Sequence, residues 1–213
     1  LRNYLPSKTE LDLWENTCYL SLVGFMFKQV RVKGIRIPLH TNFPEVNLRF
    51  YVRYRENGEW KRGVVFIKEI VPKPAITFIA NNLYNENYST LPMQSLWLEE
   101  GSAQTISYKW KKKGKWNNLE VNTDADPGPL VEGSKEEFIT EHFWGYSSIS
   151  KYKTAEYHVE HPRWNIYPVN QYLIDCDYSG IYGKEFAFLQ WQKPDSVFLA
   201  EGSGVSVFSK RVL

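Results

Sequence analysis

The chain has 213 residues, and its 26 basic residues nearly match its 24 acidic ones, so the net charge is only +2. That balance excludes the strong positive field typical of proteins that bind nucleic acids or anionic membranes, and we expect neither partner. The longest apolar run, residues 19–27, is too short to cross a bilayer. Two cysteines, far apart in apolar surroundings, are typical of reduced thiols, so we expect a cytoplasmic protein.

The chain predicts many short strands joined by turns, with few helices and no internal repeat. Strand patterns occur at residues 10–14, 17–27, 30–38, 46–55, 64–67, 94–99, 105–110, 118–123, 155–161 and 165–169, and a final hairpin is expected at 196–210. Helical patterns occur at residues 74–84, 134–142 and 183–190. The sequence therefore predicts an α+β protein, mainly antiparallel β with two or three helices, as a large curved sheet or barrel with an interior cavity.

Lys73 lies between two prolines, where a strand passes into the predicted helix. Pro74 fits the first helical turn, which places Lys73 at the cap. The helix dipole and nearby cations disfavour an ammonium there, so Lys73 could be a neutral nucleophile; alternatively the helix start holds an anion, or the lysine is simply solvated. Lys68 and Glu69 point to opposite sides of the preceding strand, so only one of them can share a pocket with Lys73.

Residues 46–55 alternate regularly, with apolar side chains on one face and polar ones on the other. Glu45, Asn47 and Arg49 extend the polar face. Inside a barrel these three would form a clamp for a carboxylate, because the guanidinium of Arg49 offers two parallel donors. On the outside of the sheet they would simply be exposed to solvent, and the sequence leaves both interpretations open.

Two further groups contain histidines. Glu141 and His142 precede Trp144 and Tyr146, and burial among these aromatic rings would favour acid or base chemistry; a structural histidine bonded to a carbonyl is the alternative. In the stretch 158–161, two histidines flank a glutamate, but the second histidine points away from the first in a strand. Because a metal needs three converging ligands, we expect no metal here, and we expect no other cofactor.

Segments spread over the whole chain carry a resemblance to a known family: residues 5–6, 10–12, 21–25, 43–49, 65–72, 137–142 and 200–203. They resemble the YqjF-like bacterial proteins of the acetoacetate-decarboxylase-like superfamily. The resemblance implies a cone-like antiparallel barrel with a central cavity, but no known activity. In the decarboxylases, a lysine after a proline forms a Schiff base with a β-keto acid, and an adjacent lysine lowers its pKa. Pro72-Lys73 resembles the first half of that motif, whereas Pro74 replaces the second lysine, so Lys68, Arg49 or the helix dipole would have to activate Lys73.

We therefore expect residues 1–213 to form a single acetoacetate-decarboxylase-like domain that lacks a natural N-terminal segment. We hypothesise that its cavity binds or transforms a small organic acid, such as a keto acid. The expected catalytic residues are Lys73, Glu69 and His142, and the expected ligand-binding residues are Arg49, Asn47, Glu45, Lys68, Glu141, Trp144 and Tyr146. A lyase-like activity stays open, as do a homo-oligomer and the alternative of a noncatalytic structural or sensor protein with a closed apolar interior.

Overall fold

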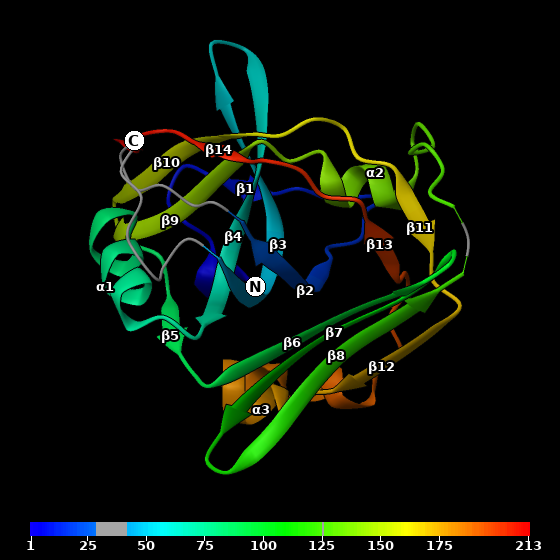
Figure 1. Ribbon diagram of the computed structural model, residues 1–213. Coiled ribbons are helices and arrows are strands. Elements are labelled where there is room, and N and C mark those ends of the chain that lie inside the picture. The colour runs from blue at the N-terminus through cyan, green and yellow to red at the C-terminus, as the bar shows by residue number, and fades with distance from the viewer. Residues whose placement is uncertain (29–41, 125) are drawn as a thin grey trace.

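The computed structural model describes residues 1–28, 42–124 and 126–213, and most of its strands pair in antiparallel fashion (Figure 1). A nine-stranded sheet contains β1 (Glu10–Leu11), β2 (Leu20–Phe27), β3 (Phe43–Glu56), β4 (Glu59–Val71), β5 (Tyr88–Thr90), β9 (Trp144–Ser150), β10 (Lys153–Glu160), β14 (Ser206–Val207) and β15 (Arg211–Val212). A four-stranded sheet contains β6 (Met93–Glu100), β7 (Ala103–Lys112), β8 (Lys115–Thr123) and β12 (Gln171–Asp175). The remaining strands, β11 (Ile166–Pro168) and β13 (Phe198–Ala200), pair with each other.

Helices are few and short, as the sequence predicts. They are α1 (Pro74–Leu83), α2 (Lys135–Thr140), α3 (Tyr178–Tyr182) and the 3₁₀ helices η1 (Arg2–Tyr4) and η2 (Lys184–Trp191). Lys73 is the N-cap of α1 and Pro74 its first residue, as expected. The Ser134 hydroxyl accepts a hydrogen bond from the Glu137 amide and so caps α2, which ends two residues before the predicted end at His142. The mainly antiparallel β class is thus confirmed.

Some of the predicted elements differ from the structure. The expected hairpin at 196–210 is wrong: β13 pairs with β11, and β14 pairs with β10. The five residues between these two strands let each reach a different partner, which a tight turn would prevent. Strands β5, β9, β12 and β15 and the helices α3 and η1 were not predicted. The strand expected at 30–38 lies outside the described residues.

The long β3–β4 hairpin organises the molecule. Asn57 and Gly58 both have positive φ, 52° and 90°, which is the backbone geometry that makes Asn-Gly the preferred two-residue turn between twisted strands. One face of the hairpin packs against the four-stranded sheet, α3 and η2. The core between these layers contains Val46, Leu48, Phe50, Val52, Val65, Ile67, Ile70, Ile106, Tyr108, Trp110, Cys176, Tyr178, Ile181, Tyr182 and Phe186. The apolar alternation of 46–55 is therefore the face that this core buries.

The opposite face of the hairpin is apolar at both ends and polar in the middle. At one end Phe43 and Val71 pack with Ile76 of α1. At the other end Tyr51 and Val64 pack with α2. Between the two apolar clusters lies a polar stretch, which we define as Glu45, Asn47 and Arg49 of β3 with Glu69 of β4. The two apolar clusters thus enclose a zone of ionisable and hydrogen-bonding side chains.

Candidate functional site

Three glutamates are buried together beside the polar stretch. Glu45 is 1% exposed, Glu69 is 2% exposed, and Glu86, from the loop between α1 and β5, is 9% exposed. The charges of Glu45 and Glu86 both act on Glu69, so the three form one cluster. Within the described ranges, no lysine or arginine pairs with any of the three. We call them the glutamate cluster.

Hydrogen bonds from neutral groups replace the missing ion pairs. The Asn47 amide donates to Oε1 of Glu45 at 2.9 Å, and the Tyr88 hydroxyl donates to Oε2 of Glu45 at 2.9 Å. Tyr88 reaches the cluster because β5 runs parallel to β4 and places Tyr88 beside Glu69. The cluster is therefore satisfied in part by neutral donors, which favour an ionised carboxylate less than a cation does.

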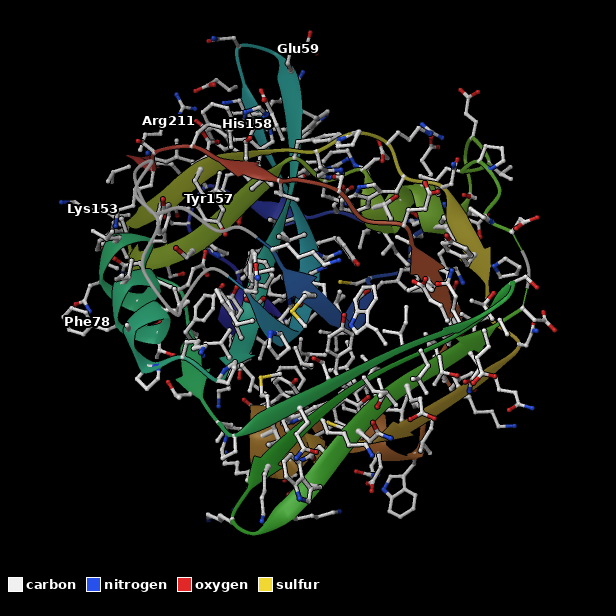
Figure 2. All side chains as sticks on the ribbon, viewed as in Figure 1. Glu59, Phe78, Lys153, Tyr157, His158 and Arg211 are labelled. Carbon is white, nitrogen blue, oxygen red and sulfur yellow. The ribbon has the colours of Figure 1, made fainter. Side chains whose placement is uncertain are left out.

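Tyr157 closes the cluster from β10, where it precedes His158 (Figure 2). It pairs directly with Gly145 of β9, and a Cβ atom at Gly145 would lie only 2.0 Å from the tyrosine ring. The glycine therefore lets the ring lie flat against β9. In this position Tyr157 hydrogen-bonds Glu86 and packs edge-on against Tyr84, with ring centroids 5.5 Å apart.

Burial disfavours the ionised form of all three carboxyl groups in the glutamate cluster. It raises the pKa of Glu45 to about 7, although the bonds from Asn47 and Tyr88 and the charge of Arg49 oppose the shift. It raises the pKa of Glu86 to about 8. The pKa of Glu69 lies well above its ordinary value, first because of burial and then because of the neighbouring carboxyl groups. Near neutral pH the cluster therefore holds protons that it can donate, which is the condition for general acid chemistry.

Several polar atoms of the glutamate cluster, of the rest of the polar stretch and of the two residues after α2 are buried without a hydrogen-bond partner among the described residues. They are Oδ1 of Asn47, Nε of Arg49, Oε2 of Glu69, Oε1 of Glu86, Oε1 of Glu141 and Nδ1 of His142. In the same described part of the chain, only Nε1 of Trp110 and the hydroxyl of Tyr182, on the other side of the hairpin, share this property. Buried polar groups are normally paired, so this concentration indicates a place where a ligand or water completes the bonding.

Arg49 connects the glutamate cluster with the end of α2. Its guanidinium donates to the carbonyl of Ile139 at 3.5 Å and lies 5.9 Å from the centroid of the Tyr51 ring. His142, just after α2, packs on the same ring, with centroids 4.7 Å apart. The side chain of His142 is 1% exposed, and its Nε2 lies 3.2 Å from Oδ2 of Asp12. The polar stretch thus has an acidic end at the glutamate cluster and a histidine end at α2.

The other predicted site residues lie in different surroundings. Lys73 is half-buried at the start of α1, and the structure records no contact between it and Arg49. Lys68 faces away from Glu69, as the alternation requires, and its ammonium donates to the carbonyl of Ile181 at 2.7 Å. Burial lowers the pKa of Lys68. Trp144 packs against His158, with centroids 4.6 Å apart, and Tyr146 donates to Glu156; neither is recorded in contact with the glutamate cluster.

Sequence reasoning missed four residues that the structure brings into the site: Asp12, Glu86, Tyr88 and Tyr157. Asp12 lies in one of the segments that carry the family resemblance, whereas the other three lie in no motif, and each of the four reaches the site through a pairing of distant segments. Asp12 and His142 are 130 positions apart. The only local signal was the isolated charge of Glu86 between two asparagines, directly after a helix. Such a signal does not show which way the side chain points.

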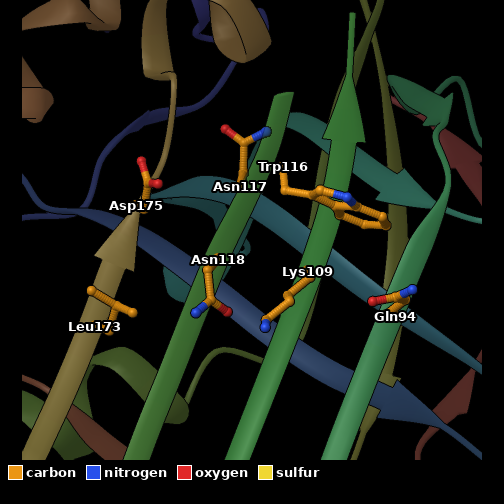
Figure 3. Close-up of a pocket in the computed structure, with 7 residues that line it drawn as sticks. All are labelled: Gln94, Lys109, Trp116, Asn117, Asn118, Leu173 and Asp175. Carbon is orange, nitrogen blue, oxygen red and sulfur yellow. The ribbon is translucent and has the colours of Figure 1, made fainter. Parts of the chain in front are cut away.

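Two shallow hollows lie elsewhere, on the outer face of the four-stranded sheet. Figure 3 shows one of them, where side chains from four neighbouring strands meet. Its lining residues are Gln94, Lys109, Trp116, Asn117, Asn118, Leu173 and Asp175. The second hollow shares Gln94 and Lys109. Both are open to solvent, and none of their lining residues has a buried polar side-chain atom without a hydrogen-bond partner, so we place the candidate site at the polar stretch instead.

Within the described part of the chain, no helix is long and apolar enough to cross a membrane. The curated relative "Uncharacterized protein YqjF" of Bacillus subtilis (strain 168) is 26% identical over 170 residues, a match that spans 77% of this chain and 66% of that protein. Among solved structures, an acetoacetate decarboxylase-like enzyme from Sphingomonas wittichii RW1 superposes with a TM-score of 0.53 at 10% identity, over 97% of this chain and 80% of that one. An acetoacetate decarboxylase from Legionella pneumophila gives a TM-score of 0.43 at 10% identity, over 100% and 86% of the two chains.

The first solved structure, at 10% identity, shows a likeness of fold alone, and it agrees with the acetoacetate-decarboxylase-like fold expected from the sequence. The resemblance to YqjF-like proteins is confirmed as well. The family model DUF2071, described as "Uncharacterized conserved protein", matches residues 1–204, nearly the whole chain. The chain therefore belongs to the DUF2071 family.

Proposed function

We propose that the protein binds a small organic acid on the polar stretch of β3 and β4. The observation that carries the proposal is the concentration of buried polar atoms without partners at the glutamate cluster, Arg49 and His142. Leaving such atoms unpaired costs about 1–3 kcal/mol for each group. That cost is offset where a bound molecule or water completes the bonding, and a concentration of such atoms favours a ligand.

The charges on this face favour an acid that also carries a carbonyl group. Arg49 supplies the cation that a carboxylate needs, and its guanidinium offers several N–H donors in one plane. At the other end, the protonated carboxyl groups of Glu45 and Glu86 can donate hydrogen bonds to a carbonyl oxygen. A keto acid presents both groups on one short chain, and Glu69 is then placed to move protons.

Lys73 enters the proposal as the amine for a keto acid. With a β-keto acid, its amine would attack the keto carbon and water would leave. The resulting protonated imine would then accept the electron pair of the carbon–carbon bond that breaks when the carboxylate departs as carbon dioxide. Support comes from its place at the end of β4, the strand that carries Glu69. The likeness of fold to the acetoacetate decarboxylase-like enzyme from Sphingomonas wittichii RW1 adds support by analogy.

We further infer that the nine-stranded sheet forms part of a cone-like wall around the ligand. In support, β3, β4, β5 and β10 all send side chains into one polar zone.

We also place the protein in the cytoplasm, and the two free thiols of Cys18 and Cys176 support a reducing compartment.

Calorimetric titration with a panel of keto acids and plain carboxylic acids tests the binding proposal. Arg49→Gln should weaken binding at least about tenfold, because it removes the cation that faces the carboxylate. Arg53→Gln is the matched control: Arg53 lies on the same face of β3 but pairs with the exposed Glu10, so the variant should bind like the wild type. If no acid of the panel binds the wild-type protein, the proposal is wrong.

Borohydride trapping separates binding from catalysis. A keto acid that binds should leave a reduced adduct on Lys73, detected by peptide mass spectrometry. Lys73→Ala should lose the adduct, whereas Lys153→Ala, at an exposed site on β10, should keep it. Binding without an adduct on Lys73 would leave the acid-binding function in place and remove the Schiff base.

A further inference from the structure

Among the described residues, only one of the two ring nitrogens of His142 has a hydrogen-bond partner. Its Nε2 lies 3.2 Å from Oδ2 of Asp12, and the same oxygen accepts a hydrogen bond from Nε of Arg62 at 2.7 Å. Tyr51 and Phe138 pack on the ring, with centroids 4.7 Å and 5.2 Å away. The other ring nitrogen, Nδ1, is buried and has no hydrogen-bond partner among the described residues. The ring is thus fixed in orientation with one polar atom unused.

The contact with Asp12 decides which nitrogen of His142 carries the proton. Although burial raises the pKa of Asp12, the bonds from His142 and Arg62 outweigh it, so the carboxyl is ionised and can only accept. Nε2 must therefore carry a hydrogen. Burial lowers the pKa of His142 to about 4, the bond to Asp12 opposes that shift, and the charges of Arg62 and Arg49 add to it. A neutral ring with hydrogen on Nε2 leaves a lone pair on Nδ1.

An unused donor lies in the same neighbourhood. Nε of Arg49 is buried without a partner among the described residues, and its guanidinium lies 5.9 Å from the Tyr51 ring, on which His142 also packs. The Tyr51 hydroxyl is already bonded to Ser21 at 2.6 Å. At this end of the polar stretch, the atoms without partners among the described residues are thus one donor, Nε of Arg49, and two acceptors, Nδ1 of His142 and Oε1 of Glu141.

We propose that Nε of Arg49 and Nδ1 of His142 together recognise a hydroxyl group of the bound acid, and that Asp12 is the residue that positions His142 for this contact. A hydroxyl can accept a hydrogen bond from Nε of Arg49 and donate one to Nδ1 of His142. A carbonyl oxygen can only accept, and a methylene group can do neither. The inference rests on the proposed function, since the same Arg49 holds the carboxylate. It narrows the ligand to acids with a hydroxyl on the carbon next to the carboxylate, including the enol form of an α-keto acid.

Three acids of equal length test the contact: lactate, pyruvate and propionate carry a hydroxyl, a keto oxygen and neither at the same carbon. Calorimetry at pH 7 on the wild-type protein should show lactate binding at least about tenfold more tightly than propionate, because only lactate satisfies both groups. In selectively ¹⁵N-labelled protein, the Nδ1 resonance of His142 should shift with lactate and stay unchanged with propionate.

Two substitutions of His142 separate its two nitrogens. In His142→Gln the amide nitrogen replaces Nε2 and keeps the bond to Asp12, but nothing replaces Nδ1, so the preference for lactate should vanish. In His142→Asn the amide lies near the position of Nδ1, so part of the preference should return. Asp12→Ala should reduce the preference by loosening the ring, while the Nδ1 resonance broadens. If these variants fail to fold, the Nδ1 resonance of His142 in the wild-type protein still tests the contact, through its response to lactate and to propionate.

The outcomes distinguish the two proposals. If none of the three acids nor any of the wider panel binds, both are overturned. If acids bind but lactate and propionate bind equally well, only the hydroxyl contact is overturned and the acid-binding function stands. A preference for lactate that persists unchanged in His142→Gln also overturns the contact, because it would arise without Nδ1.

Discussion

Two sets of buried glutamates in this protein have opposite surroundings. Glu156 of β10 is 0% exposed and accepts a bond from Nε of Arg211 at 2.6 Å, one from Lys61 at 3.3 Å and one from the Tyr146 hydroxyl at 3.0 Å. The glutamate cluster is also buried, yet its hydrogen-bond partners are neutral amide and hydroxyl groups.

We interpret the difference as one between a carboxylate with a structural role and carboxyl groups that we propose to be functional. Arg211 belongs to β15, so the Glu156 site ties the C-terminal strand to β10. The glutamate cluster ties nothing comparable together and is costly to ionise. Groups of that kind concentrate at sites of binding and catalysis. Changing a glutamate to glutamine should therefore have opposite effects at the two sites.

The largest effect is expected at the paired site. Glu156→Gln should lower the free energy of unfolding at pH 7 by about 4 kcal/mol, because it removes the fully buried carboxylate on which Lys61, Arg211 and Tyr146 converge, even though both cations keep their ion pairs with Glu56. Urea denaturation measures the loss. Glu160→Gln, on the same strand but exposed, should change stability by less than about 0.5 kcal/mol. Equal effects of the two variants would contradict a structural role for Glu156.

A smaller effect of opposite sign is expected in the glutamate cluster. The pKa of Glu45 is higher in the folded protein than in the unfolded chain, so its contribution to stability is present below about pH 4 and is lost as the pH rises through about 7. Glu45→Gln cannot ionise and should avoid that loss. Its free energy of unfolding should exceed that of the wild type by about 3 kcal/mol at pH 8, with no gain at pH 4.

Denaturation of both proteins across this pH range measures the difference. A gain of the same size at pH 4 and pH 8 would mean that packing, and not ionisation, explains the result. Glu156→Gln serves as the internal comparison, since it should destabilise the protein at pH 8.

The smallest effects are expected from the two tyrosines that serve these sites. Tyr146→Phe removes a donor from Glu156 and should cost about 2 kcal/mol, because hydrogen bonds to a charged carboxylate are the stronger kind. Tyr88→Phe removes a donor from Glu45 and should cost about 1 kcal/mol at pH 5, where that carboxyl is protonated. A larger loss in Tyr88→Phe than in Tyr146→Phe would reverse the comparison.

Local features of the site could be read from the sequence with good success. The alternation of β3 identified Glu45, Asn47 and Arg49 as one polar face, and the structure places them so. The alternation could not show whether that face is exposed to solvent or buried by other elements. The structure buries Glu45 and Asn47 and half-buries Arg49, because α1, α2 and the neighbouring strands cover the face.

The sequence by itself determined what depends on neighbours along the chain: the strand periods, the Asn57-Gly58 turn, the cap at Lys73 and the opposite directions of Lys68 and Glu69. Only the tertiary structure decided which side chains meet. Glu86 touches Tyr157, and Asp12 touches His142, because strand pairing and packing bring distant segments together. A period of two residues assigns a side chain to a face, but it carries no information about which strand will lie opposite that face. That choice is made by the packing of the whole molecule.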